Sequence, residues 1–363
     1  MAFEHNSNQP FAKQLRPANS AAASGFRWIA EWHPHAATWI SWPHNLATWP
    51  GRFEHVPATF EQMVRALADV EHVHVLGGPP HTLALAKEAI GDCENVTLHH
   101  ITTNDCWIRD FGPTFVLGDD GKTLGGIDWR FNAWGNKYHP HDSDAVGAKR
   151  ICRNVDAVYF RSPLTCEGGG LETDGEGTLL TTSSCLMSSA RNPGWTREQI
   201  EQELQQALAV EKVLWIDGGS LEGDDTDSHI DQLVRFIRPG LVVAAVSRNS
   251  DDSNHEPLAK QLDLLRQVTD ARGRKFDIVP IETPPPRYIQ GQRVPESYCN
   301  FYIANEIVLV PQFGFRETDE AALRQLGELM PDRRMVPIDS RELIWGRGSF
   351  HCSTQQQPKT LAL

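Results

Sequence analysis

Five strand-helix-strand units follow one another along this chain, and this repetition is the feature that most constrains its fold. Each unit begins with a short apolar run, continues with a helix that carries one apolar stripe, and ends with a second apolar run. In the third unit, Thr196 and Gln199 form a capping box ahead of a stripe at Ile200, Leu204 and Leu208. The predicted helices cover residues 60–70, 144–155, 196–208, 257–268 and 319–330.

Each predicted helix stands between two predicted strands. The strands cover residues 38–43 and 72–78, 125–132 and 157–160, 177–185 and 212–217, 241–247 and 276–281, and 306–313 and 334–339. Such units form either an open doubly wound sheet or smaller sheets arranged radially about an axis. No glycine-rich phosphate-binding motif follows a strand, and the polar motifs recur at similar points of successive units. The sequence therefore favours an α/β fold of the radial kind.

No linker-like stretch divides the chain, so we expect one domain over residues 26–363 and a flexible tail over residues 1–25. The tail lacks the continuous apolar segment of a secretory signal. The seven cysteines include no C-x-x-C pair, so the sequence predicts neither a zinc knuckle nor a disulfide framework. Together these features predict a cytosolic protein.

The acidic composition limits the possible partners. A formal net charge of −13 argues against nucleic acid and against an anionic membrane surface. No apolar run approaches the roughly 18 to 20 residues that a membrane span needs. A cationic ligand suits this charge, although many proteins are acidic for solubility alone.

Four polar segments carry residues that a packed core does not explain. They cover residues 104–115, 166–180, 223–232 and 346–358. The first contains the candidate site residues Trp107 and Asp110, the second Glu167, the third His229 and Asp231, and the fourth Cys352. His229 and Asp231 alternate, so on an extended strand both side chains would point to the same face.

Simpler interpretations exist for single segments. Asp224, Asp225 and Asp227 could belong to a calcium loop, but the glycine and glutamate positions of an EF-hand loop are not matched. A single intracellular cysteine is often an inert small hydrophobic residue. The combination of a thiol, an imidazole and several carboxylates is what points to chemistry.

A cationic substrate resolves a conflict within this set of residues. Buried carboxylates without partners cost several kcal/mol each and would keep a nearby thiol protonated. A guanidinium group is planar, always charged, and presents pairs of N–H donors that match carboxylates. Its central carbon then remains open to attack by a thiolate.

This chemistry gives a mechanistic hypothesis. Asp110 and Asp231 hold the guanidinium nitrogens, and Cys352 attacks the central carbon. His229 protonates the departing ammonia and then activates the water that hydrolyses the covalent thiouronium, while Glu167 assists His229 or the substrate. The product is a ureido compound.

Seven ordered blocks of this sequence resemble the agmatine deiminase family, within the superfamily shared with bacterial-type peptidylarginine deiminases. The resemblance extends from Phe26 to Pro358. The blocks are "AEWHPHAATWISWP", "NDCWIRDFGPTF", "DWRFNAWG", "DGEGTLLTT" followed by "RNPG", "DDTDSHIDQ", "SYCNFYIAN" and "HCSTQQQP".

The resemblance implies a five-bladed α/β propeller, the pentein fold, with the active site at its axis. It implies the catalytic residues Cys352, His229, Asp110, Asp231 and Glu167, and it places Trp107 and Asn300 in the pocket. Trp134 and Arg347 are further candidate substrate-binding residues. The implied reaction converts agmatine and water to N-carbamoylputrescine and ammonia, as in putrescine biosynthesis and polyamine metabolism. It uses no metal and no organic cofactor. Family members commonly form homo-oligomers, so a homodimer is expected.

The sequence departs from the family pattern near the nucleophile. Arg347, Ser349 and Phe350 replace a glycine, an asparagine and an aliphatic residue. Other departures are Asp227 and Ser228 in place of Asn-Gly, Gln232 in place of Asn, and Trp28 and Ile29 in place of Met-Pro. We expect these changes to affect recognition of the substrate tail rather than the chemistry.

Tail recognition leaves alternatives open. Agmatine ends in an amine, whereas a C-terminal peptidylarginine ends in a carboxylate and calls for a basic pocket residue. Trp134 and the small Ala133 favour agmatine, while Arg130 and Arg347 leave the carboxylate possible. An amidinotransferase and a non-catalytic binder of cations are the remaining alternatives.

Overall fold

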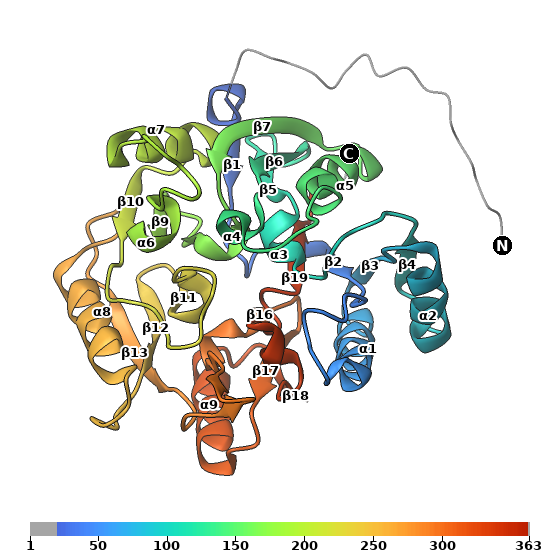
Figure 1. Ribbon diagram of the computed structural model, residues 1–363. Coiled ribbons are helices and arrows are strands. Elements are labelled where there is room, and N and C mark those ends of the chain that lie inside the picture. Colours follow the sequence, from blue (N-terminus) through green and yellow to red (C-terminus); the bar gives the residue numbers. More distant parts are fainter. Residues whose placement is uncertain (1–19, 362–363) are drawn as a thin grey trace.

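The computed structural model describes residues 20–361 and has five principal sheets arranged around a central axis (Figure 1). The fold is the predicted five-bladed α/β propeller. Residues 1–19 of the predicted tail lie outside the described residues, whereas residues 20–25 include the 3-10 turn η1 (Ala22–Ser24) and the buried Ala21. Within residues 20–361, no helix is both long and apolar enough to cross a membrane.

Four of the blades share one construction. A strand is followed by an antiparallel second strand, then by a helix, and then by a third strand parallel to the second. The second blade consists of β5 (Thr114–Gly118), β6 (Leu124–Arg130), α5 (Gly147–Asn154) and β7 (Val158–Thr165), with β1 (Phe26–Trp28) added at its edge. The third consists of β8 (Glu172–Thr173), β9 (Thr178–Thr181), α7 (Arg197–Leu208) and β10 (Lys212–Trp215).

The fourth and fifth blades repeat this order, and a short hairpin lies between them in sequence. The fourth consists of β11 (Val234–Arg238), β12 (Leu241–Val246), α8 (His255–Gln267) and β13 (Asp277–Glu282). The fifth consists of β16 (Tyr302–Ile303), β17 (Ile307–Gln312), α9 (Arg316–Leu329) and β18 (Arg334–Asp339). The hairpin consists of β14 (Tyr288–Ile289) and β15 (Gln292–Arg293).

The first blade closes the ring because its first strand comes from the C-terminal end of the chain. That strand, β19 (Thr354–Pro358), pairs antiparallel with β2 (His35–Ser41). The remaining elements of the blade are α1 (Val56–Ala68), β3 (His72–Leu76), α2 (Pro80–Ile90) and β4 (Val96–His99). Figure 1 shows β19 beside β2, next to the axis.

Apolar helix faces pack the blades as the sequence predicts. Thr196 and Gln199 form the expected capping box at the start of α7, and Ile200, Leu204 and Leu208 are fully buried. Burying each such side chain contributes about 1.5–3 kcal/mol relative to leaving it exposed in water. The ten predicted strands and five predicted helices are all present, and most differ from the prediction only at their ends. The strand predicted over residues 177–185 ends at Thr181, and residues 183–185 instead belong to the short helix α6 (Ser183–Leu186).

A short helical turn precedes the first strand of four blades. These turns are α3 (Ile108–Phe111), η4 (Gly168–Gly170), η5 (Ile230–Gln232) and η6 (Tyr298–Asn300). Consecutive turns contact one another, and the loop that ends at β19 occupies the same place in the first blade. The remaining short elements are η2 (Phe53–His55), α4 (Ala133–Asn136), η3 (Asp144–Val146), α6 (Ser183–Leu186) and η7 (Leu343–Gly346). The four predicted polar segments thus meet at one end of the axis.

Candidate active site

Cys352 lies in the loop that leads into β19, and Asn300 holds this loop in place. The Asn300 side chain oxygen accepts hydrogen bonds from the backbone N–H groups of Ser349 (3.1 Å) and Cys352 (3.3 Å). Its amide nitrogen lies 3.2 Å from the Cys352 Sγ. Asn300, predicted to contact substrate, therefore contacts the thiol itself.

Asp231 lies beside the thiol on η5. Its Oδ2 is 3.5 Å from the Cys352 Sγ, and its buried Oδ1 has no hydrogen-bond partner among the described residues. Because η5 is a 3-10 helix, the expectation that His229 and Asp231 alternate on an extended strand is wrong. The two side chains nevertheless converge, because the turn folds them toward the same point.

Gly169 marks the point of convergence. A Cβ atom on this glycine would lie 2.7 Å from His229 Nδ1, 2.8 Å from Asp110 Oδ1 and 3.0 Å from Asp231 Oδ2. Three candidate site residues from two blades therefore surround one backbone atom of a third blade. Only a residue without a side chain fits there while those groups keep their places.

Replacing Gly169 by alanine should therefore reduce kcat/KM by about 10²-fold, because displacements near 1 Å at a reacting centre cost that much. Gly327→Ala is the matched control, since a Cβ at this position in α9 meets only Met335, at 3.6 Å. Steady-state assays with a guanidine substrate measure both variants. Equal activity of the two variants would contradict the placement of the three side chains around Gly169.

His229 is fully buried between two carboxylates. Its Nδ1 lies 3.7 Å from Asp110 Oδ1, and its Nε2 lies 3.5 Å from Glu167 Oε2. Burial alone would lower the pKa of His229, but the charge of Asp110 opposes burial, and the pKa is raised well above its usual value. The imidazole is therefore protonated and able to donate a proton.

Asp110 lies on α3 and receives two hydrogen bonds. The Trp134 indole N–H donates to its Oδ2 (2.9 Å), and the Gly169 backbone N–H donates to its Oδ1 (3.0 Å). Burial raises the pKa of Asp110 to about 6, and the nearby charges of Asp231 and Glu167 act in the same direction. A bound cation would favour its ionised form.

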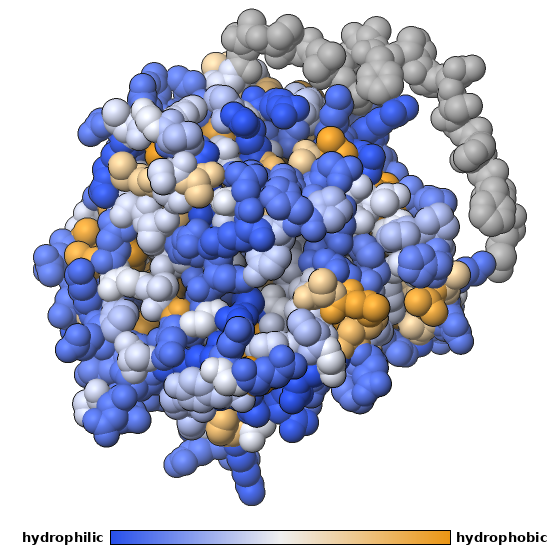
Figure 2. Space-filling view, in the orientation of Figure 1, coloured by the Kyte–Doolittle hydropathy of each residue, from blue (hydrophilic) through white to orange (hydrophobic). Residues whose placement is uncertain are grey.

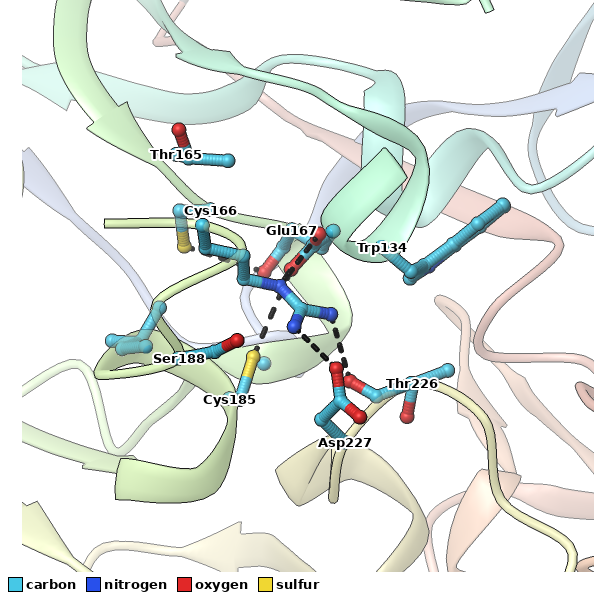
Figure 3. Close-up of polar contacts among 12 residues, drawn as sticks. Trp134, Thr165, Cys166, Glu167, Cys185, Ser188, Thr226 and Asp227 are labelled. Atoms are coloured by element: carbon cyan, nitrogen blue, oxygen red, sulfur yellow. Dashed lines mark hydrogen bonds and ion pairs between the residues drawn. The ribbon is translucent and has the colours of Figure 1, made fainter. Parts of the chain in front are cut away.

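Glu167 is held by an arginine that the sequence interpretation did not assign. The Arg191 Nε lies 3.0 and 2.9 Å from the two Glu167 carboxylate oxygens. Arg191 also donates to Asp227 Oδ2 (2.6 Å) and to the Thr226 carbonyl (2.8 Å). Figure 3 shows Glu167, Thr226 and Asp227 directed toward this guanidinium. Burial would raise the pKa of Glu167, but Arg191 and His229 lower it.

His351 joins Asp231 to a second buried carboxylate. Its Nδ1 lies 2.7 Å from Asp231 Oδ2, and its Nε2 lies 2.9 Å from Glu31 Oε2. Both ring nitrogens therefore face carboxylate oxygens. Burial would raise the pKa of Asp231, but the hydrogen bond and charge of His351 lower it. His351, the neighbour of Cys352, was also not assigned from the sequence.

A cavity of about 500 Å³ leads to the thiol. Its wall includes Trp107, Asp110, Trp134, Arg347 and Cys352. His229, Asp231, Glu167 and Asn300 do not line the cavity. The face seen along the axis is mainly hydrophilic, with scattered apolar groups (Figure 2). Among the predicted catalytic residues, the cavity thus exposes the Cys352 thiol and the Asp110 carboxylate.

Arg347 adopts a left-handed backbone conformation, with φ of 73°. Its guanidinium donates to the carbonyl of Gly223 and to Gln292 Oε1 (2.6 Å), and it lies 5.6 Å from the centre of the Trp345 ring. No carboxylate among the described residues forms an ion pair with it. Its donors therefore fix neighbouring loops at the cavity wall.

Comparison with known proteins supports one family. A family model of Porphyromonas-type peptidyl-arginine deiminases matches residues 27–358. An agmatine deiminase from Medicago truncatula is 35% identical over 370 residues, covering 94% of this chain and 98% of the relative. The structure of an Enterococcus faecalis agmatine deiminase catalysing its reaction has a TM-score of 0.90 and 31% identity, covering 96% of this chain and all (100%) of that one.

A second solved structure is an agmatine deiminase of C. jejuni, a cysteine-to-serine variant with substrate bound. It has a TM-score of 0.85 and 28% identity, covering 93% of this chain and 97% of that one. These matches extend over almost the whole chain and include both the propeller and the converging turns. The chain therefore belongs to the agmatine deiminase family, within the group of Porphyromonas-type peptidyl-arginine deiminases.

Proposed function

We propose that this protein is an agmatine deiminase, which hydrolyses the guanidinium of agmatine to N-carbamoylputrescine and ammonia. The observation that carries the proposal is the position of Cys352 beside Asp231 and close to the Asp110 carboxylate, at the inner end of the cavity. Two buried carboxylates flanking a thiol fit a planar cation better than any neutral group.

The substrate itself activates the nucleophile. Burial raises the pKa of Cys352 well above its usual value, and the charges of Asp231 and Asp110 raise it further. A guanidinium bound between these carboxylates offsets their charge, so the thiol loses its proton when substrate is present. The thiolate then forms a bond to the central carbon of the guanidinium.

His229 acts in both halves of the reaction. It first donates its proton to the departing nitrogen, so that the C–N bond breaks, ammonia leaves and a cationic thiouronium remains on Cys352. The neutral imidazole then takes a proton from water as the water oxygen bonds to the same carbon. The C–S bond breaks as the carbonyl forms, and the remaining hydroxyl proton passes to ammonia or solvent. The Glu167 carboxylate, held by Arg191, stabilises the imidazolium.

The cavity wall favours an amine at the far end of the substrate. It contains the carboxylates of Asp105, Asp144 and Asp225 in addition to Asp110. Asp105 and Asp144 accept hydrogen bonds from backbone N–H groups, whereas the Asp225 carboxylate accepts from the Tyr138 hydroxyl. Arg347 directs its donors to carbonyl and amide oxygens rather than toward a substrate carboxylate. These contacts support agmatine over an arginine-terminated peptide.

Replacing Asp225 by asparagine should raise the KM for agmatine about tenfold, because an ionic contact to the substrate amine is lost. Hydrolysis of n-butylguanidine, which lacks the amine, provides the control and should change less than about twofold. Steady-state ammonia release from both substrates measures the effect. An equal rise in KM for both substrates would show that Asp225 does not bind the amine.

A substrate panel tests the proposed function as a whole. Ammonia release is measured with agmatine, free arginine and an arginine-terminated peptide, and the products are identified by mass spectrometry. Agmatine should have the highest kcat/KM and should yield N-carbamoylputrescine. A clear preference for the peptide, or transfer of the amidino group to an added amine, would replace the proposal with one of the alternatives.

The activity should fall at acid pH because Asp110 must be ionised to bind the guanidinium. Its pKa of about 6 lies above that of a free aspartate, so the clamp is complete above this pH and is lost as pH falls through it. Since kcat/KM reports ionisations of the free enzyme, it should drop about tenfold per pH unit below about 6. Recovery of activity on return to neutral pH is the control for stability. A kcat/KM that stays constant down to about pH 5 would contradict this assignment.

Two further properties stand on the resemblance alone, namely assembly as a homodimer and a place in putrescine biosynthesis and polyamine metabolism. Location in the cytosol is proposed from the cysteine pattern. Sedimentation analysis of the purified chain measures the first directly.

A further inference from the structure

Behind the cavity, the Cys185 thiol lies near the His229 imidazole and the Glu167 carboxylate. The Cys185 Sγ lies 3.7 Å from Glu167 Oε2, and His229 Nε2 lies 3.5 Å from the same oxygen. One donor atom from each residue lies within 4.8 Å of the other two, and all three residues are buried. Figure 3 shows Cys185 and Glu167 directed toward the same space. The proposed reaction makes no use of Cys185.

The donor set matches a particular metal. Thiolate, imidazole and carboxylate are the ligands that Zn²⁺ takes in proteins, and separations of roughly 3 to 4 Å between donors suit a tetrahedral ion. Both ring nitrogens of His229 are buried without a hydrogen-bond partner among the described residues. The Nε2 atom is therefore free to become a ligand once it loses its proton.

The charges around the site can balance a bound ion. The Arg191 guanidinium lies beside Glu167 and would repel an added cation, but the Asp227 carboxylate pairs with Arg191 (2.6 Å) and offsets its charge. Zn²⁺ takes cysteine as a thiolate and histidine as a neutral imidazole, so a bound ion would face one thiolate and one carboxylate charge.

We propose that Glu167, Cys185 and His229 form an inhibitory site for Zn²⁺. Zinc bound there occupies the nitrogen of His229 and removes the proton that the departing ammonia needs, so the enzyme is reversibly switched off. Because the ligands are buried behind the cavity, inhibition should develop slowly.

Binding is tested independently of any substrate in the Cys352→Ala variant of the full chain. Zn²⁺ titration against a chromophoric chelator should show one tight site, and Co²⁺ should give a thiolate-to-cobalt charge-transfer band. The double variant Cys352→Ala/Cys185→Ser should lose the band and bind Zn²⁺ at least about tenfold more weakly. Circular dichroism of both proteins shows whether each is folded, and Cys352→Ala/Cys185→Ala provides a second removal of the thiol.

The outcomes separate this proposal from the proposed function. Loss of the band with Cys185 supports the site whether or not agmatine is the substrate. A band that persists without Cys185 overturns the proposal, as does tight Zn²⁺ binding that requires Cys352. Inhibition is also measured in the single Cys185→Ser variant, relative to that variant's own activity after treatment with a chelator. The zinc concentration for half-inhibition should be at least about tenfold higher than for the wild-type protein.

Discussion

The Cys352→Ala variant is expected to release ammonia from agmatine at least about 10⁴-fold more slowly than the wild-type protein. Loss of the Cys352 thiol removes the covalent route to product. Removal of a nucleophile in enzymes of this kind lowers the rate on the order of 10⁴-fold or more. The clamp carboxylates and His229 remain, so agmatine should still bind. A continuous ammonia assay, together with calorimetry of agmatine binding, measures both quantities.

Cys299→Ala is the matched control, because Cys299 is also buried but contacts the backbone carbonyl of Leu233 rather than the cavity (3.6 Å). This variant should retain activity within severalfold, after allowance for any loss of stability. If Cys352→Ala keeps more than about a hundredth of the wild-type rate, the thiol cannot be the nucleophile.

The Asp231→Asn variant should lose about 10²- to 10³-fold in kcat/KM. Removing the charge of one partner in a buried, hydrogen-bonded ion pair costs about 2–5 kcal/mol, and here the other partner is the substrate cation. The asparagine keeps the size of the side chain and an oxygen that can accept from His351, so the turn should remain folded. Single-turnover rates and agmatine affinity should both fall.

Asp217→Asn is the control for the Asp231 variant, because Asp217 forms a surface ion pair with Arg197 (3.5 Å). Its Oδ1 also accepts from the Ser183 backbone N–H (2.7 Å), and the asparagine oxygen can keep this hydrogen bond. Such pairs contribute about 0–1 kcal/mol, so its activity should not change measurably. Wild-type affinity for agmatine in Asp231→Asn would place the guanidinium elsewhere in the cavity.

The sequence predicts the parts of the fold that have a strong local pattern. The ten strands and five helices of the units follow from apolar periodicity, and the capping box at Thr196 follows from residue chemistry. The strand that begins each blade was missed. The strand β8 has only two residues, and the glutamines of β19 carry no apolar signal. In contrast, β5 and β11 are largely apolar five-residue strands that the predicted strand-helix-strand units did not include.

The candidate site was partly predictable for a related reason. Cys352, His229, Asp110 and Glu167 stand in segments whose composition is unusual for a core. Glu31 lies far from these segments in sequence, and only folding brings it close to His351. Arg191 stands in the quoted motif "RNPG", in the same blade as Glu167, but the motif itself gives no chemical role for the arginine. His351 is adjacent to the thiol, but its carboxylate partners Glu31 and Asp231 are distant in sequence, so no local pattern could reveal these contacts.

Packing explains the two glycines before the nucleophile, Gly346 and Gly348. In the structure, a Cβ on Gly348 would lie 2.6 Å from the Trp107 ring, and a Cβ on Gly346 would lie 2.7 Å from the Trp49 indole nitrogen. The left-handed residue between them is Arg347. Trp107 thus both lines the cavity and fixes the loop.

The most direct test of the account follows one turnover of agmatine with the protein in excess. Samples quenched in acid at successive times are digested and mapped by mass spectrometry, while ammonia and N-carbamoylputrescine are measured in parallel. The account predicts a transient amidino adduct on the peptide that carries Cys352, appearing with ammonia and decaying as N-carbamoylputrescine forms. Complete turnover with no adduct at any time, or with an adduct on another cysteine, would contradict it.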